Sequence, residues 1–344
     1  MSANLPLVSI CIPTYNGEQY LEVALQSAIN QTYTNIEILI VDDCSTDNTR
    51  AIINTLHQSD GRIKLITNTK NVGLVRNWSN CIAEASGQWI KFLFQDDLLE
   101  PTCVATMLNA CRVHNTEFAI CNRTFILEQG ISDSLKITFS KKIYTLPELF
   151  ENRKYTPIES ATLLKTFITQ NILGEPICLL FSKKIYNTVN GFNYKMKQLV
   201  DYHFTLKLIL NNNVAIVTEP LVNFRVHNTS TSSKNEAAQN EKTTIIKNIQ
   251  ATEGDHIQLL DCILNDSWFY QLKQHWAASK LELLKQRYYY KACKNKGKQN
   301  TIAALTELLT PKDMDILKQY NFIKYLQNKY LYNKKIKPYL ASKK

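Results

Sequence analysis

Two adjacent carboxylates, Asp96 and Asp97, directly follow a run of apolar residues in the segment WIKFLFQDD. The run, residues 89–94, has the composition of a buried strand. An ionised carboxylate at the end of a core strand costs free energy unless a positive charge compensates it. The pair therefore predicts a cation at this point of the fold. The alternative is that the two aspartates only cap a following helix.

Two other strand-like runs also end on polar residues. SICIP leads into Thr14 and Tyr15, and ILIV ends on Asp42 and Asp43. Ligands bind outside the carboxyl ends of parallel strands, so an aromatic ring and two carboxylate pairs would meet in one crevice if the three strands are neighbours in one sheet. The ring could stack on a base, and a carboxylate pair could hold Mg²⁺ or Mn²⁺ on a diphosphate. The alternative for residues 15–17 is a simple turn.

The elements that would position these residues alternate between strands and helices. This order predicts βαβ units and an α/β fold with a mostly parallel sheet flanked by helices. The continuous apolar strands indicate that both faces of the sheet are covered. Neither GxGxxG nor GxxxxGK[ST] follows the first strand, which argues against dinucleotide and P-loop enzymes. The expected strands are 7–12, 36–41, 63–66, 89–94 and 117–127, and the expected helices are 18–30, 47–57, 73–85 and 101–114.

The pattern changes to helices alone after residue 233, so we expect a first domain at 1–233 and an all-helical region at 234–344. Residues 287–344 hold 14 Lys or Arg against three acids, a surplus of +11 in a chain of net charge +10. Basic, aromatic-rich helices suit an anionic membrane surface, and a solvated helical face is the alternative. Nucleic acid is not an expected partner, because no nucleic-acid module is recognisable and Arg287 is the only arginine of this region.

The expected location is cytoplasmic. Residues 1–11 lack the pattern of a signal peptide, and the apolar runs are shorter than the ~18 residues that a membrane span needs. The nine cysteines form no CxxC pair, which favours a reducing compartment. Any membrane contact would therefore be peripheral, at the cytosolic face of the inner membrane.

Three segments resemble successive parts of the inverting family-two glycosyltransferases of bacterial surface-polysaccharide synthesis. The resemblance covers residues 7–233 and implies a GT-A-like (Rossmann-like) domain with a divalent metal cofactor, Mn²⁺ or Mg²⁺. It also implies hexosyl or N-acetylhexosaminyl transfer, with inversion, from a nucleotide-sugar donor such as a UDP-sugar to a glycan or lipid-linked acceptor. The segments are PTYNGEQYLEVALQSAINQTYTNIEILIVDDCSTDNT, NVGLVRNWSNCIAEASGQWIKFLFQDD and PLVNFRVHNTSTS.

The resemblance implies nucleotide-binding roles for six residues. Tyr15 would lie against the base, and Asp43 would accept a hydrogen bond from it. Asp96 would face the ribose or the metal. Arg76 would contact the nucleotide, with a solvated helix position as the alternative. The full set is Pro13, Thr14, Tyr15, Asp43, Arg76 and Asp96.

The resemblance further implies that Asp97 and His227 bind the metal and that Asp201 is the catalytic base. Asp201 could instead cap a helix, and His227 could be structural. The chain departs from the family pattern at Val200, where an acid is usual, and at Gln95, where more acidic residues are common; the second departure predicts modest metal affinity.

A non-catalytic GT-A-like scaffold that docks on anionic membrane surfaces is the alternative from another functional class. Val200 favours the scaffold. The joint presence of six site residues favours the enzyme: Tyr15, Asp43, Asp96, Asp97, Asp201 and His227.

Overall fold

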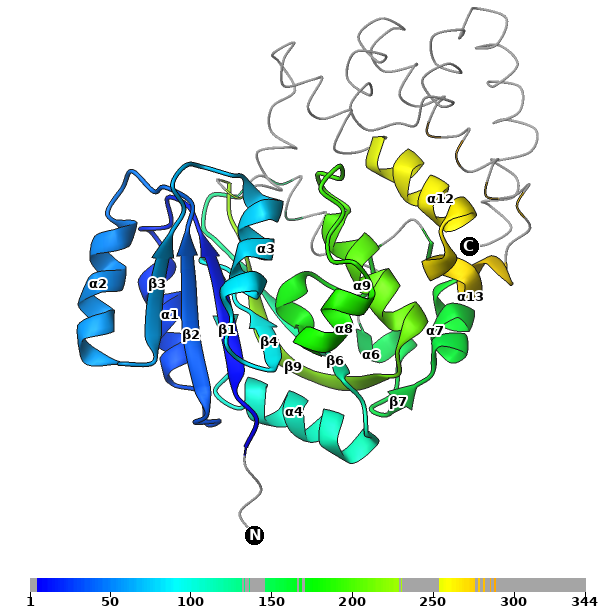
Figure 1. Ribbon diagram of the computed structural model, residues 1–344, viewed down its shortest axis with the longest axis horizontal. Coiled ribbons are helices and arrows are strands. Elements are labelled where there is room, and N and C mark those ends of the chain that lie inside the picture. Colours follow the sequence, from blue (N-terminus) through cyan, green and yellow to red (C-terminus); the bar gives the residue numbers. More distant parts are fainter. Residues whose placement is uncertain are drawn as a thin grey trace, which may run out of the picture. The chain divides into compact units, whose positions relative to one another are not determined.

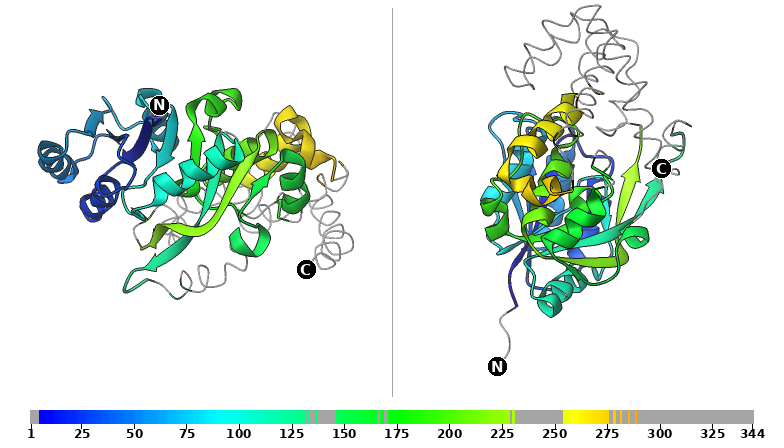
Figure 2. Two further views of the ribbon diagram at one scale, coloured as in Figure 1. Left: turned by 90° about the horizontal axis from the view of Figure 1, so that it is seen from below. Right: turned by 90° about the vertical axis from the view of Figure 1, so that its right-hand side faces the viewer.

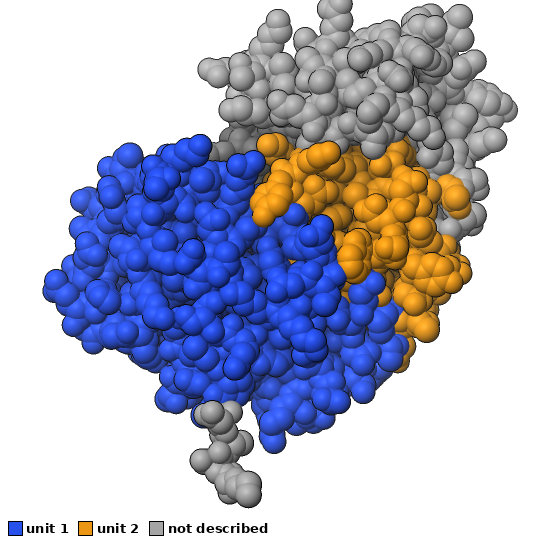
Figure 3. All heavy atoms as spheres, in the orientation of Figure 1, with its two compact units in different colours: residues 1–157, 171–192, 211–227 blue, residues 158–170, 193–210, 228–344 orange. Residues whose placement is uncertain are grey.

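The computed structural model describes residues 5–131, 146–228 without 166, 169 and 170, and 254–275, together with scattered single positions. Its contacts divide the chain into two compact units (Figure 3). Unit 1 comprises residues 1–157, 171–192 and 211–227, and unit 2 comprises residues 158–170, 193–210 and 228–344. Most of the predicted basic helical region, including nearly all of residues 287–344, lies outside the described residues. Its proposed membrane contact and the boundary at residue 233 stay predictions.

Unit 1 is built on one nine-stranded sheet, so the predicted α/β fold is confirmed (Figure 1). The strand order is β3-β2-β1-β4-β8-β6-β9-β5, and β7 pairs with β9 off this path. The strands are β1 Val8–Thr14, β2 Ile36–Asp42, β3 Ile63–Thr67, β4 Trp89–Phe92, β5 Leu98–Leu99, β6 Phe118–Leu127, β7 Lys154–Tyr155, β8 Leu179–Ser182 and β9 Val214–Val226.

The sheet is parallel where the sequence predicted it. β1 pairs in parallel with β2 and β4, and β2 pairs in parallel with β3. The long strands β6 and β9 are also parallel and run side by side (Figure 2). Antiparallel pairings are short and join β8, β5 and β7 to this framework. Every residue of β1 and β2 is buried, because helices cover both faces of this part of the sheet.

The helices of unit 1 follow from right-handed crossovers. The chain steps outward from β1 to β2 to β3, then returns to β4 in the opposite direction. Right-handed connections therefore place the first two helices on one face and the third on the other, as Figure 1 shows. The helices of this unit are α1 Leu21–Ile29, α2 Thr49–Ser59, α3 Leu74–Glu84, α4 Cys103–His114, α6 Leu146–Leu149, the short 3₁₀ helix η1 Pro176–Cys178 and α8 Lys183–Thr188.

The described part of unit 2 is helical. Its central helix α9, Val200–Asn211, is buried over nearly all of its length. Phe269 packs against the ring of His203 on α9, with ring centroids 5.6 Å apart. Among the helices described, none is both long and apolar enough to cross a membrane. The other elements are α7 Pro157–Leu164, whose first residue is counted in unit 1, α12 Asp255–Asn265, the 3₁₀ helix η3 Ser267–Phe269 and α13 Tyr270–Lys273.

Candidate functional site

The carboxyl ends of β1, β2 and β4 meet at one edge of the sheet. Thr14 pairs with Asp42 at the last position of the β1–β2 ladder. Asp43 donates its backbone N–H to the Thr14 carbonyl at 2.8 Å. β4 runs parallel to β1 on its other side, so the segment leading to Asp97 leaves the sheet at the same edge. Pro13 and Thr14 are buried beneath this edge.

Asp43 anchors the loop that joins β3 to α3. Its buried carboxylate accepts hydrogen bonds from Asn68 Nδ2 at 2.8 Å and from the backbone N–H groups of Val72 at 2.8 Å and Gly73 at 2.9 Å. Gly73 has φ of 85°, a conformation that favours glycine. The three bonds use most of the roughly four lone-pair positions of a carboxylate, leaving about one for a base N–H.

The loop after β1 is fastened to the loop after β2 and exposes Tyr15. Asn16 has φ of 47°, and its Oδ1 accepts the Thr46 N–H at 2.8 Å. The backbone N–H of Gly17 donates to Thr49 Oγ1 at 2.8 Å. Tyr15 is 47% exposed, so its ring is accessible for stacking on a planar ligand.

Gln95 holds the backbone of Tyr15 in place, a role that the sequence did not reveal. Its Oε1 accepts the Tyr15 N–H at 2.8 Å, and its Nε2 donates to the Tyr15 carbonyl at 3.2 Å. A Cβ added at Gly17 would lie 2.6 Å from Gln95 Oε1, so a larger residue at position 17 would displace the Gln95 amide from this place. Only an amide can donate and accept in this way, which gives a physical reason for Gln95 in place of an acid.

We expect Gln95→Ala to weaken binding of UDP, the nucleotide that the family resemblance implies, about 10-fold. The substitution removes two hydrogen bonds worth about 1 kcal/mol each, part of which the loop recovers by bonding to water. Isothermal titration calorimetry with UDP measures the effect, and Gln58→Ala, at an exposed position of α2, is the matched control. Equal UDP affinity in Gln95→Ala and Gln58→Ala would show that Gln95 does not position the ligand.

Asp96 and Asp97 meet the end of β9 because β5 follows them directly. β5 pairs antiparallel with β9, with Leu98 opposite Asn223. The chain before β5 therefore lies beside the residues that follow position 223. The Asp96 carboxylate reaches His227, with 2.9 Å between Oδ2 and Nε2. The side chains are 24% and 10% exposed, so this pair is partly accessible.

Asp97 is a buried carboxylate with one unsatisfied oxygen. It is 1% exposed, and its Oδ1 accepts the backbone N–H of Arg225 at 2.8 Å. Its Oδ2 has no hydrogen-bond partner among the described residues. Burial, helped by the charge of Asp96, raises the pKa of the Asp97 carboxyl well above its ordinary value. A hard divalent cation fits these donors, because it would complete the free oxygen and neutralise the paired carboxylates.

Arg225 organises this cluster, and sequence reasoning missed it. Its Nε donates to the Asp96 carbonyl at 2.8 Å, and its guanidinium pairs with Glu128. The guanidinium also lies over the Tyr20 ring, 4.7 Å from the centroid. The His227 ring also contacts the Tyr20 ring, with 4.9 Å between the two centroids. The signal that could have revealed Arg225 is a charged residue within the strand-like segment NFRVH.

The remaining two predicted residues, Arg76 and Asp201, are not part of the Asp96–Asp97–His227 cluster. Arg76 is exposed in the first turn of α3. Asp201 belongs to unit 2, in the first turn of α9. It is partly exposed, and its Oδ1 accepts the N–H of the adjacent Tyr202 at 2.7 Å. The structure thus brings Asp96, Asp97 and His227 together and places Asp201 in a separate unit.

Asp255 caps the segment that leads into α9. Its Oδ2 accepts three consecutive backbone N–H groups, those of Lys197, Gln198 and Leu199, at 2.8, 2.6 and 2.8 Å. Burial outweighs these bonds and raises the pKa of Asp255 from 3.8 to about 6. This contact fixes the chain just before Asp201, and nothing in the local sequence around either segment predicts it.

The raised pKa of Asp255 predicts a pH-dependent stability. The folded chain holds the Asp255 proton more tightly than the unfolded chain, so stability is lost as the pH rises from about 4 to 6. A shift of about 2 pKa units corresponds to about 3 kcal/mol. Asp255→Asn lacks this titration, so its free energy of unfolding relative to wild type should rise by about that amount between pH 4 and 7.

Urea unfolding at several pH values measures this difference. Asp133→Asn is the control, because the side chain of Asp133 is 90% exposed. A difference between Asp255→Asn and wild type that does not change with pH would contradict the interpretation.

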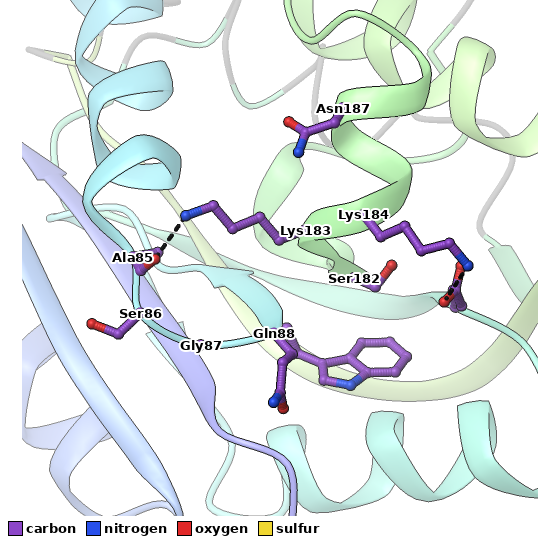
Figure 4. A pocket seen from close by; sticks show the side chains of 10 residues that line it. Ala85, Ser86, Gly87, Gln88, Ser182, Lys183, Lys184 and Asn187 are labelled. Carbon is purple, nitrogen blue, oxygen red and sulfur yellow. Dashed lines mark hydrogen bonds and ion pairs between the residues drawn. The ribbon is translucent and has the colours of Figure 1, made fainter.

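A hollow of about 540 Å³ lies at the amino end of β4 and is not the candidate site (Figure 4). Trp89 is the first residue of β4, whereas Asp96 and Asp97 follow its last residue. The hollow and the candidate site therefore lie at opposite ends of this strand. The two lysines of the hollow are engaged: Lys183 donates to the carbonyl of Ala85 at 2.7 Å, and Lys184 pairs with Glu117 at 3.2 Å. Neither lysine of the hollow is therefore free to bind an anion.

Comparison with known proteins finds one matching family and several similar chains. Residues 9–171 match the model of the family described as Glycosyl transferase family 2. The uncharacterised protein MT1568 of Mycobacterium tuberculosis (strain CDC 1551 / Oshkosh) is 30% identical over 66% of this chain and 69% of its own length. The UDP-Glc:alpha-D-GlcNAc-diphosphoundecaprenol beta-1,3-glucosyltransferase WfgD of Escherichia coli is 35% identical over 39% of this chain. That match spans 54% of WfgD.

A solved structure shares the fold. The crystal structure of a fragment of S. aureus TarS in complex with UDP-GlcNAc superposes with a TM-score of 0.60 at 16% identity. The likeness covers 93% of this chain and 88% of that one. At this identity the likeness supports the fold alone.

Proposed function

The chain belongs to glycosyltransferase family 2, and from this premise we propose that it transfers one sugar from a UDP-sugar to a lipid-linked glycan, with inversion and with a divalent metal. The observation that carries the proposal is the buried Asp97, whose Oδ2 has no partner among the described residues, beside Asp96 and His227. The cluster lies at the sheet edge where α/β proteins bind their ligands.

The donor would bind along the carboxyl edge of β1, β2 and β4. The exposed Tyr15 ring would stack on the base, and Gln95 would keep that loop in place. Asp43 would hold the 68–73 loop and offer its remaining lone pair to the base. The accessible guanidinium of Arg76 would complement the negative charge of the diphosphate. A uridine donor is supported by the names of the relatives, since TarS was solved with UDP-GlcNAc and WfgD uses UDP-Glc.

The metal would be held by Asp97 and His227, with Asp96 beside them. When bound, it would supply positive charge to the diphosphate as this group departs with the bonding electrons. Arg225 would fix the positions of both aspartates. Its backbone N–H donates to the Asp97 carboxylate, and its guanidinium donates to the backbone carbonyl of Asp96. Mn²⁺ and Mg²⁺ are the ions that suit this oxygen-rich set.

Asp201 would take the proton of the acceptor hydroxyl. The hydroxyl oxygen then attacks the anomeric carbon, and the bond from that carbon to the diphosphate oxygen breaks. Attack from the face opposite the leaving group inverts the anomeric configuration. Val200 in place of a second acid would leave Asp201 to act as a single base.

The acceptor class is supported by the relatives rather than by the site. WfgD acts on a diphosphoundecaprenol-linked sugar, as its name states. A lipid-linked acceptor would bring the enzyme to a membrane surface, and the surplus of +11 in residues 287–344 would favour contact with anionic headgroups. This contact and the role in surface-polysaccharide synthesis remain parts of the proposal.

A transfer assay tests the function. The full chain is incubated with a panel of UDP-sugars, Mn²⁺ or Mg²⁺, and undecaprenyl-diphosphate-linked sugars, and UDP release is measured with and without acceptor. Acceptor-dependent UDP release from one donor, with NMR showing the opposite anomeric configuration in the product, is the expected result. Retention of configuration would refute inversion. Failure to bind or release UDP with any donor would instead favour the non-catalytic scaffold.

A further inference from the structure

Three potential metal ligands of different chemistry converge in unit 2, apart from the proposed donor site. His203 lies on α9, Cys262 on the last turn of α12, and Asp266 directly after that helix. Figure 1 labels both helices. One ligand atom from each residue lies within 4.8 Å of the other two. The proposed function uses none of these side chains.

His203 is buried without a hydrogen bond. It is 3% exposed, and neither Nδ1 nor Nε2 has a partner within the described part of the chain. An unpaired buried polar group destabilises the fold, so a ligand for this imidazole would remove that penalty. Burial, with the nearby charge of Lys207, lowers the pKa of His203 to about 3. The ring is therefore neutral and keeps a lone pair for a metal.

The other two donors are half-buried and linked to each other. The Cys262 thiol contacts the Asp266 carboxylate, and the Asp266 N–H donates to the Cys262 carbonyl at 2.8 Å. The spacing of four residues places both side chains on one side of the end of α12. Because both are partly exposed, an ion can enter from this side and keep a water ligand.

We propose that His203, Cys262 and Asp266 form a Zn²⁺ site that joins α12 to α9. Imidazole, thiolate and carboxylate are the three ligand types that Zn²⁺ takes in proteins, whereas Mg²⁺ and Mn²⁺ prefer oxygen alone. In a tetrahedral Zn²⁺ site the ligand atoms lie about 3.5 Å apart. Side-chain rotations that bring the atoms closer by about 1 Å would close the site, with water as the fourth ligand.

Lys207 is the competing cation. It lies one turn after His203 on α9, and the charges of Cys262 and Asp266 act on its ammonium. Burial outweighs these charges and lowers the pKa of Lys207 to about 8. The lysine can therefore lose its proton when a metal takes its place. Removing its charge should strengthen metal binding.

The site would bear on catalysis through α9. His203 follows Asp201 by two residues in the first turns of this helix. A metal ion bound by His203 together with Cys262 and Asp266 would hold α9, the helix that carries the proposed base, against α12. This effect is independent of the Asp97 cluster, which belongs to unit 1.

Cobalt substitution tests the proposal. The full chain is stripped with a chelator, kept reduced, and titrated with Co²⁺ as a spectroscopic substitute for Zn²⁺. A thiolate ligand gives a near-ultraviolet charge-transfer band that oxygen ligands do not give. We expect this band in wild type, its displacement by Zn²⁺, and a rise in melting temperature with Zn²⁺. Affinity should increase with pH, because the thiol must lose its proton.

The variants separate this site from others. Cys262→Ser should abolish the band, and His203→Gln and Asp266→Asn should each lower Co²⁺ affinity by more than about 100-fold, beyond the loss seen for second-shell changes. Lys207→Met should raise the affinity. Asp97→Asn and the controls Cys44→Ser and His114→Gln should keep the wild-type charge-transfer band. A wild-type band in Cys262→Ser, no band in wild type, or a band lost in Asp97→Asn would overturn the assignment.

Discussion

Asp97→Asn is expected to lower sugar transfer by more than about 100-fold while the protein stays folded. The amide keeps an oxygen for the Arg225 N–H, so the local backbone retains its contact. It removes the charge that the metal requires, and even second-shell changes at metal sites cost about 10–100-fold. Initial rates at saturating donor, with Mn²⁺ varied, measure the loss and show whether added metal rescues it.

Stability separates this effect from misfolding. Burial raises the pKa of Asp97, so at neutral pH its ionised form destabilises the metal-free chain. Asp97→Asn should therefore melt at or above the temperature of metal-free wild type. Glu117→Gln is the control, an acid at the opposite edge of the sheet that pairs with Lys184. Normal activity and metal dependence in Asp97→Asn would rule out Asp97 as a ligand.

Asp201→Asn is expected to lower turnover by at least ~10²-fold, within the range for loss of a general base. Donor binding should be unchanged, because the substitution leaves unit 1 intact. The amide oxygen can still accept the Tyr202 N–H, so the first turn of α9 keeps its bond. Single-turnover rates and UDP affinity, measured on the same preparation, distinguish the two effects.

The competing interpretation of Asp201 predicts the opposite pattern. If the side chain serves only the start of α9, turnover stays near wild type and the melting temperature falls. Asp261→Asn, which breaks an ion pair with Lys285 in the same unit, shows how far an acid-to-amide change alone shifts stability. A pH–rate profile that loses its acidic limb in Asp201→Asn would further support the base.

Local sequence patterns were enough to predict the positions of most of the long strands of the sheet. Runs such as 7–12 and 36–41 are apolar enough to be strands in any arrangement, and the structure places β1 at Val8–Thr14 and β2 at Ile36–Asp42. The order of the strands was not predicted, because right-handed crossovers narrow the possible orders without fixing one. The two-residue strand β5 was missed, since pairing with β9 rather than its own sequence makes it a strand.

The site was harder to predict because its parts come from distant segments. Asp96 and Asp97 were evident from their position after a buried strand, whereas Arg225 gains its role only through contact with them. Gln95 looked like a weakened acid until the structure showed its amide bonded to Tyr15. Asp255 accepts the backbone N–H groups of residues 197–199, which lie more than fifty positions before it in the sequence. No local sequence pattern predicts a contact over such a separation.

The affinity of the wild-type chain for UDP, measured by calorimetry with and without Mn²⁺, tests the central claim most directly. If Asp96, Asp97 and His227 hold a metal against a diphosphate, Mn²⁺ should tighten UDP binding at least about 10-fold, or 1.4 kcal/mol. Excess chelator should reverse the gain, and uridine, which lacks the diphosphate, should bind equally in both conditions. The same UDP affinity with and without Mn²⁺ would contradict the account.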